Sequence, residues 1–255
     1  MSDFTSALNA YALTPFQWGV VCCCAFIFAL AKGGVKGVDI FAVPIMAIIL
    51  GSKASTGIVL PMLLVGDIFS VWYYNRAAKW YHLRKLAVWI VLGILLAVWI
   101  GKDMPEAGFK YALAGIILSS ILILLWLEQK KDATVPNRTW FSVVAGLFVG
   151  FTTMVGNVGG AFANILFPSN EILQRAIHRH FRMVVFLVNV FKVPFHVVVW
   201  KTITWQSLAI NLVALPFIAL GLWVGVYLVK IIKEKYYRRM VLILTALGAI
   251  LIFLK

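Results

Sequence analysis

The sequence predicts an all-α integral membrane protein of about eight to ten transmembrane segments, arranged in two inverted repeats with short, glycine-broken helices. Of its 255 residues, 63% are hydrophobic and 13% are charged. Soluble domains average about 45–50% apolar and about 25% charged residues, so a water-soluble fold of this size cannot bury so many apolar side chains. A second observation, a similarity between the two halves of the chain, predicts the repeat.

Apolar segments recur along the whole chain. A helix needs about 20 apolar residues to cross the hydrocarbon core of a bilayer. Two segments, 38–50 and 158–168, are too short to cross comfortably, and each follows a glycine-rich break, at 31–37 or at 155–160. They are either two full crossings or re-entrant hairpins. In chain order the segments are 16–31, 38–50, 54–74, 83–101, 108–127, 139–155, 158–168, 181–200, 205–230 and 237–254.

The distribution of Lys and Arg predicts the orientation in the membrane. The loops on one side of the membrane hold fifteen Lys and Arg residues, and those on the other side hold five. Lys32, Lys36 and Lys192 fall inside segments or breaks and are not counted. Cytoplasmic loops collect Lys and Arg, so we expect both termini outside the cytoplasm, in a plasma (inner) membrane. The net charge of +14 therefore indicates a membrane orientation, with the lipid bilayer as partner, and not nucleic-acid binding.

The repeat relates residues 1–130 to residues 131–255 at an offset of about 125. Its clearest match pairs four residues of the first half with four of the second, in the same order: Trp80, Leu83, Trp99 and Gly101 with Trp205, Leu208, Trp223 and Gly225. Each half holds five apolar segments, an odd number, so the halves enter the membrane from opposite sides. Inverted repeats with interrupted helices are typical of secondary transporters.

Parts of both halves resemble the TauE/SafE sulfite exporter family. The resemblance rests on GGVKGVDIFAVPIM at 33–46, KASTG at 53–57 and the Trp80 region, and on VGNVGGAFANILF at 155–167 and Trp205 in the second half. It covers nearly the whole chain as a diffuse pattern. It implies a transporter for sulfite, sulfonates such as sulfoacetate, or related small anions. The sequence departs from the pattern by adding positive charge, at Lys32, at Lys36 and in HRHFRMVV at 178–185.

The two glycine breaks are the predicted anion site. A broken helix exposes backbone N–H groups, which together with a lysine ammonium hold an anion. Lys32 and Lys36 flank the first break, although either can instead extend to the membrane interface. Asn157 occupies the second break, where its alternative role is helix capping. The predicted substrate-binding residues are Lys32, Gly34, Lys36, Gly37, Gly156, Asn157, Gly159, Asn189 and Lys192.

Asp67 and Lys192 are predicted to form an ion pair inside the membrane. Each lies thirteen residues before a matching tryptophan, Trp80 or Trp205, so they are equivalent in the two halves. Breaking this pair, by protonation of Asp67 or by anion binding to Lys192, is a candidate coupling step. His196 follows Lys192 by one turn and is either a proton relay or a hydrogen-bonded structural histidine.

Other classes of function remain as alternatives. The main expectation is alternating access with anion export; an anion channel and a proton-coupled uptake permease for a carboxylate or sulfur anion are kept open. An enzyme is not expected, because the sequence contains neither an HExxH nor a GxSxG motif. We therefore predict no catalytic residues, no metal site and no cofactor, and leave a homodimer open.

Overall fold

The computed structural model describes residues 6–8, 10–35, 38–74, 83–129, 139–159, 171–229 and 231, and the elements within these ranges are helical. The predicted all-α fold class is confirmed. The main elements are α2 (Pro15–Gly33), α3 (Asp39–Leu50), α4 (Ser52–Tyr74), α5 (Leu83–Lys102), α6 (Glu106–Gln129), α7 (Thr139–Gly156), α9 (Glu171–Pro194), the π-helix η1 (Phe195–Val199) and α10 (Trp205–Leu228).

The helices begin and end close to the predicted segment boundaries. Helix α2 starts after Thr14, whose hydroxyl accepts from the backbone N–H of Gln17 in a capping box. The largest difference is in α9, which begins at Glu171, ten residues before the predicted segment, because residues 171–180 are polar but continue the same helix. Most of segment 158–168 and all of segment 237–254 lie outside the described residues.

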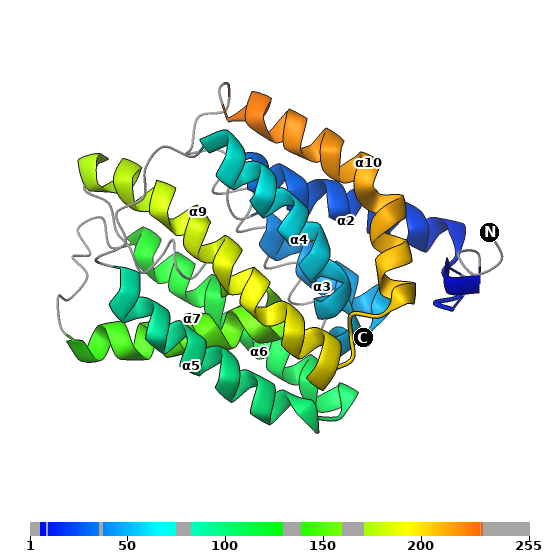
Figure 1. Ribbon diagram of the computed structural model, residues 1–255, viewed down its shortest axis with the longest axis horizontal. Coiled ribbons are helices and arrows are strands. Elements are labelled where there is room, and N and C mark those ends of the chain that lie inside the picture. The colour runs from blue at the N-terminus through cyan, green and yellow to red at the C-terminus, as the bar shows by residue number, and fades with distance from the viewer. Residues whose placement is uncertain are drawn as a thin grey trace.

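The described helices form two groups, with α9 running between them (Figure 1). One group contains α2, α3, α4 and α10; the other contains α5, α6 and α7, and α9 contacts both α4 and α5. The most extensive contacts are α2 with α10 and α5 with α7. Each joins the first long helix of one predicted half to the helix of the fourth predicted segment of the other. The predicted offset relates α2 to α7 and α10 to α5, so these two contacts are equivalent. The inverted orientation itself stays a prediction.

Glycines bring these helix pairs into close contact. A Cβ atom built on Gly33 of α2 would lie 2.9 Å from the Cα of Gly225 in α10, and one on Gly225 would lie 2.6 Å from the carbonyl oxygen of Leu30. In the other pair, Gly93 of α5 faces the backbone of Leu147 in α7. Small residues at such crossings are the usual device for helix association in membranes.

The distribution of side chains is that of a membrane protein. Four described stretches are long and apolar enough to span a bilayer: Pro15–Gly33, Ser52–Tyr73, Arg182–Val199 and Trp205–Leu228. Shorter apolar helices are Asp39–Leu50, Ala87–Lys102 and Val143–Gly156. Large apolar side chains such as Trp72, Trp99 and Trp223 point outward, while Asp67, Asn189 and Lys192 are buried. The apolar exterior thus surrounds a partly polar interior.

The turn after η1 packs deeply against the first half of the chain. Trp200 donates its indole N–H to the carbonyl of Val98 at 3.3 Å, and its ring meets Phe109 edge-on. A Cβ on Gly101 would lie 2.6 Å from this ring, so glycine is required for the fit. Thr202 packs in the same way against Gly57 at the beginning of α4. The end of α9 and the beginning of α4 are therefore held together.

Candidate anion site

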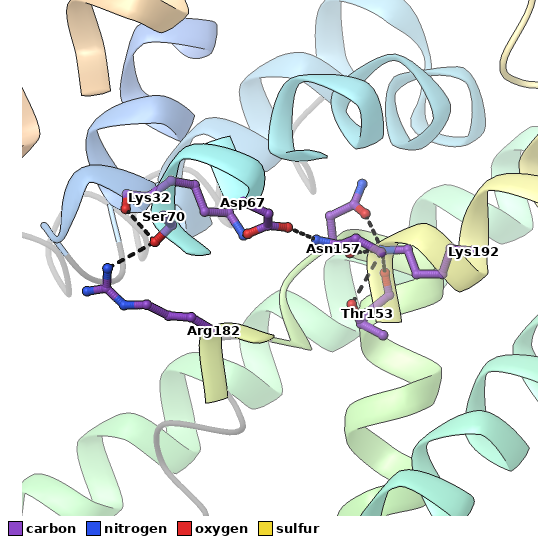
Figure 2. Close-up of polar contacts among 8 residues, drawn as sticks. Lys32, Asp67, Ser70, Thr153, Asn157, Arg182 and Lys192 are labelled. Carbon is purple, nitrogen blue, oxygen red and sulfur yellow. Dashed lines mark hydrogen bonds and ion pairs between the residues drawn. The ribbon is translucent and has the colours of Figure 1, made fainter. Parts of the chain in front are cut away.

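A chain of polar side chains crosses the interior and joins both helix groups (Figure 2). Its members come from the ends of α2 and α7, where the helices break, from the second half of α4, and from the middle to the last turn of α9, which contacts α4. We call these residues the interior network: Lys32, Asp67, Ser70, Thr153, Asn157, Arg182, Asn189 and Lys192.

The first part of the network is an ion pair between Lys32 and Asp67. Lys32 lies in the last turn of α2, and its Nζ is 2.5 Å from Oδ1 of Asp67 in α4. The lysine stem crosses α4 at Gly66, where an added Cβ would lie 2.7 Å from Cγ of Lys32. One turn further along α4, Ser70 donates its hydroxyl to the Lys32 carbonyl at 3.1 Å. The positive charge of Lys32 is therefore compensated within the protein.

The second part surrounds Lys192, whose side chain is fully buried in the last turn of α9. Its ammonium donates to the Thr153 carbonyl at 2.8 Å, to Oδ1 of Asn157 at 2.6 Å and to Oδ1 of Asn189 at 3.0 Å. The Thr153 hydroxyl lies at 3.4 Å. All four oxygens are neutral, and no carboxylate contacts this ammonium among the residues the structure describes. Lys192 is thus hydrogen-bonded without a contacting counter-charge.

Asn189 connects the two parts and replaces the direct Asp67–Lys192 ion pair that the repeat predicted. Its Nδ2 donates to Oδ2 of Asp67 at 2.6 Å, while its Oδ1 accepts from Lys192. Asp67 pairs with Lys32 instead. The physical reason is geometric: equivalent residues of a two-fold repeat meet only when they lie on the axis, and here the length of one amide side chain separates them.

The two predicted glycine breaks end α2 and α7. After α2, Gly34 adopts a φ of 130° and its N–H bonds back to Ala31. After α7, Asn157 adopts a φ of 56°, a left-handed conformation that Asn tolerates better than most side chains. Asn157 also donates to the carbonyl of Thr56 in α4 at 3.0 Å. The break therefore aims the Asn157 amide at both α4 and Lys192.

The other glycines of the predicted site have packing contacts. Gly156 faces Leu113 of α6, and Gly159 lies over the side chain of Thr153. Of two neighbouring threonines in α7, Thr152 bonds to its own helix through the Phe148 carbonyl, and only Thr153 contacts Lys192. The predicted site residues Lys36 and Gly37 lie outside the described residues.

Three members of the network, Ser70, Thr153 and Arg182, were not among the predicted site residues. Arg182 donates from Nη1 to the Ser70 hydroxyl at 2.9 Å, which extends the network along α9. A sequence signal for this exists: Arg182, Asn189, Lys192 and His196 follow helical spacing and share one face of the chain. His196 itself is fully buried, and its Nδ1 lies 2.8 Å from the Thr202 hydroxyl.

The arrangement accommodates an anion at Lys192 if one neutral oxygen moves aside, because an ammonium has three donors and all are engaged.

Comparison with known proteins gives one match. The sequence profile of the sulfite exporter TauE/SafE family matches residues 21–252, nearly the whole chain. No curated protein and no solved structure matches. With its apolar helices and this match, the chain is a multi-pass membrane protein that belongs to the sulfite exporter TauE/SafE family of membrane transporters.

Proposed function

We propose that this protein moves a small organic or inorganic anion, such as sulfite or a sulfonate, through a site centred on Lys192. The observation that carries the proposal is a fully buried ammonium that contacts only neutral oxygens of the described residues. Burying a charged group without a partner of opposite charge costs on the order of several kcal/mol. An anion beside Lys192 supplies the missing charge, so its binding is favourable.

Asn157 is the ligand that an incoming anion displaces most readily. It lies at a helix break, and the other hydrogen bond of its amide goes to a neutral carbonyl, that of Thr56, which costs less to break than a bond to a carboxylate. Asn189 is tied to Asp67, and the Thr153 carbonyl is part of α7. A rotation of the Asn157 side chain therefore opens one position on the ammonium with the smallest change elsewhere.

Transport follows from alternating access around this site. The interior network spans α2, α4, α7 and α9, so a shift of one helix group against the other changes which end of the network meets water. The predicted cytoplasmic surplus of Lys and Arg attracts anions to the inner mouth. An inside-negative potential drives a monoanion outward by about 2.3 kcal/mol per 100 mV, which favours export. This direction presumes the predicted orientation, with both termini outside the cytoplasm of a plasma (inner) membrane.

The test is flux in proteoliposomes with a panel of sulfite, sulfate, thiosulfate, sulfoacetate, taurine, acetate and lactate. We expect saturable transport of at least one anion, with counter-transport, because a carrier shows both and a channel neither. Lys192→Met keeps the length of the side chain but removes its charge, and we expect a loss of roughly 100-fold in flux. Lys102→Met, at the exposed end of α5, is the matched control and is expected to transport normally. Transport of cations or neutral solutes alone would contradict the proposal.

A further inference from the structure

His196 has a ring nitrogen that the network described above does not use. The residue is fully buried in η1, and its Nε2 has no hydrogen-bond partner among the residues that the structure describes. A buried polar atom without a partner is unusual and needs an explanation. A π-helix within a longer helix is also found frequently at functional sites.

The surroundings of His196 and Lys192 meet at the beginning of α4. His196 follows Lys192 by one helical turn. Asn157, which accepts from Lys192, donates to the Thr56 carbonyl, and Thr202, which bonds to His196, packs on the adjacent Gly57. Two neighbouring residues of α4 thus link the ligands of Lys192 to the partner of His196. Thr202 occupies the Nδ1 side of the ring, and the one-turn spacing from Lys192 places the imidazole, with its unpartnered Nε2, beside the residue at which the anion is proposed to bind.

The hydrogen bonds of Thr202 determine which nitrogen of the neutral ring carries the proton. The Thr202 hydroxyl lies 2.8 Å from Nδ1 and 3.5 Å from the His196 carbonyl. That carbonyl already accepts from the backbone N–H groups of Thr202 at 2.8 Å and Ile203 at 3.2 Å, which fills its two lone pairs. The hydroxyl proton therefore goes to Nδ1, and Nε2 carries the ring proton as a donor. The ring of Trp200, edge-on at 5.1 Å, holds the imidazole in place.

We propose that the Nε2–H group of His196 is a second donor to the transported anion, and that Thr202 positions it. The inference rests on the proposed function of Lys192 as the counter-charge. A carboxylate, a sulfonate or sulfite can place one oxygen at the ammonium and another at the imidazole. A halide must contact both donors with its single centre. His196 therefore makes the site selective for oxyanions over halides.

The experiment measures the affinity of the purified protein for sulfite, methanesulfonate and acetate, and for chloride and bromide, by competition in proteoliposome flux. His196→Phe keeps a ring but removes the donor, and we expect oxyanion affinity to fall roughly 10- to 100-fold while halide affinity stays unchanged. Thr202→Val removes the hydroxyl that fixes the tautomer, and a loss of roughly fivefold in the same selectivity ratio is expected. Ser120→Ala is the matched control, because this buried hydroxyl lies outside the interior network and donates to the Ile116 carbonyl of its own helix, α6.

A separate measurement does not depend on the folding of any variant. Nitrogen-15 NMR of the histidines in the wild-type protein should show His196 with its proton on Nε2. A proton on Nδ1, or an unchanged oxyanion-to-halide ratio in folded His196→Phe and Thr202→Val, overturns the inference. Lys192→Met separates the two proposals: loss of all anion transport in that variant keeps Lys192 as the counter-charge, whatever His196 does. Full transport by Lys192→Met would instead contradict the proposed function.

Discussion

Two lysines of the interior network lie in equivalent contacts but have different electrical surroundings. The Lys32–Asp67 contact joins the end of α2 to the second half of α4, and the Asn157–Lys192 contact joins the end of α7 to the last turn of α9. Lys32 precedes Asn157 by 125 residues, and Asp67 precedes Lys192 by the same number, which is the predicted offset of the repeat. The distances, 2.5 Å and 2.6 Å, are nearly equal. The same contact is thus built once from two charges and once from a charge and an amide.

This difference indicates a division of labour between the halves. In the first contact the carboxylate of Asp67 satisfies Lys32, so the pair holds α2 on α4 and has no need of an external ion. In the second contact the partner is neutral, and the fully buried Lys192 has no contacting carboxylate among the described residues. The first contact is therefore suited to structure and the second to binding.

The largest effect is expected from removing the charge of Asp67. Asp67→Asn leaves the Lys32 ammonium largely buried without its carboxylate, and breaking a buried pair in this way costs about 3–5 kcal/mol. We expect the free energy of unfolding, measured by denaturant titration in detergent micelles, to fall by about 3 kcal/mol. The expected loss is at the low end of the range for a broken buried pair because the Lys32 side chain remains 15% exposed.

The double variant Lys32→Gln with Asp67→Asn is the control for this loss. It removes both charges and keeps hydrogen-bonding groups on both helices, so at least half of the lost stability should return. A double variant as unstable as the sum of the two single variants would mean that Lys32 and Asp67 are not coupled.

A smaller effect is expected from cutting the link between the two contacts. Asn189→Leu removes the amide that joins Asp67 to Lys192 and leaves two buried groups short of a partner, which costs about 1–3 kcal/mol. Anion transport should fall as well, because Lys192 loses one of its ligands. Asn211→Leu is the matched control, since the hydrogen bond of its amide among the described residues is to the Ser207 carbonyl of the same helix, α10. Equal losses in both variants would argue against a linking role.

The smallest effect is expected from the hydroxyl of Thr153. It lies 3.4 Å from the Lys192 ammonium, at the outer limit of a hydrogen bond, whereas the Thr153 carbonyl is closer and stays in place in Thr153→Val. We expect a change in anion affinity of about threefold or less. Thr152→Val, which affects a hydroxyl bonded within α7, is the control. A large loss of affinity in Thr153→Val alone would show that the hydroxyl binds the anion directly.

The helices and breaks were predictable because apolar length and glycine clusters act locally along the chain. Segment 83–101 corresponds closely to α5, and the breaks end α2 and α7 at Gly33 and Gly156. The early start of α9 was missed because hydropathy marks apolar spans, whereas residues 171–180 are a polar continuation of the helix.

Part of the interior network was predictable, but Ser70, Arg182 and some of the contacts were not. Charge inside the apolar segments and the predicted repeat selected Asp67 and Lys192, the glycine break selected Asn157, and the one-turn spacing from Lys192 selected Asn189. The predicted repeat makes Asp67 and Lys192 equivalent but does not say whether they touch, because contact depends on how far each lies from the axis. The offset of 125 also makes Asn157 the equivalent of Lys32. With this second equivalence, the sequence would have indicated the Lys32–Asp67 and Asn157–Lys192 contacts that the structure contains.

The most direct test supplies Lys192 with an internal counter-charge and measures anion binding. Asn157→Asp places a carboxylate where the amide oxygen lies 2.6 Å from the ammonium, and thereby copies the Lys32–Asp67 pair. Aspartate, like asparagine, tolerates the positive φ of this position. For the wild-type protein, an anion at 100 times its Kd stabilises the fold by about 2.7 kcal/mol, which a thermal-shift assay detects. The account predicts a folded Asn157→Asp protein that sulfite and other anions no longer stabilise. Wild-type anion stabilisation of this variant would contradict the assignment of Lys192 as the counter-charge of the anion.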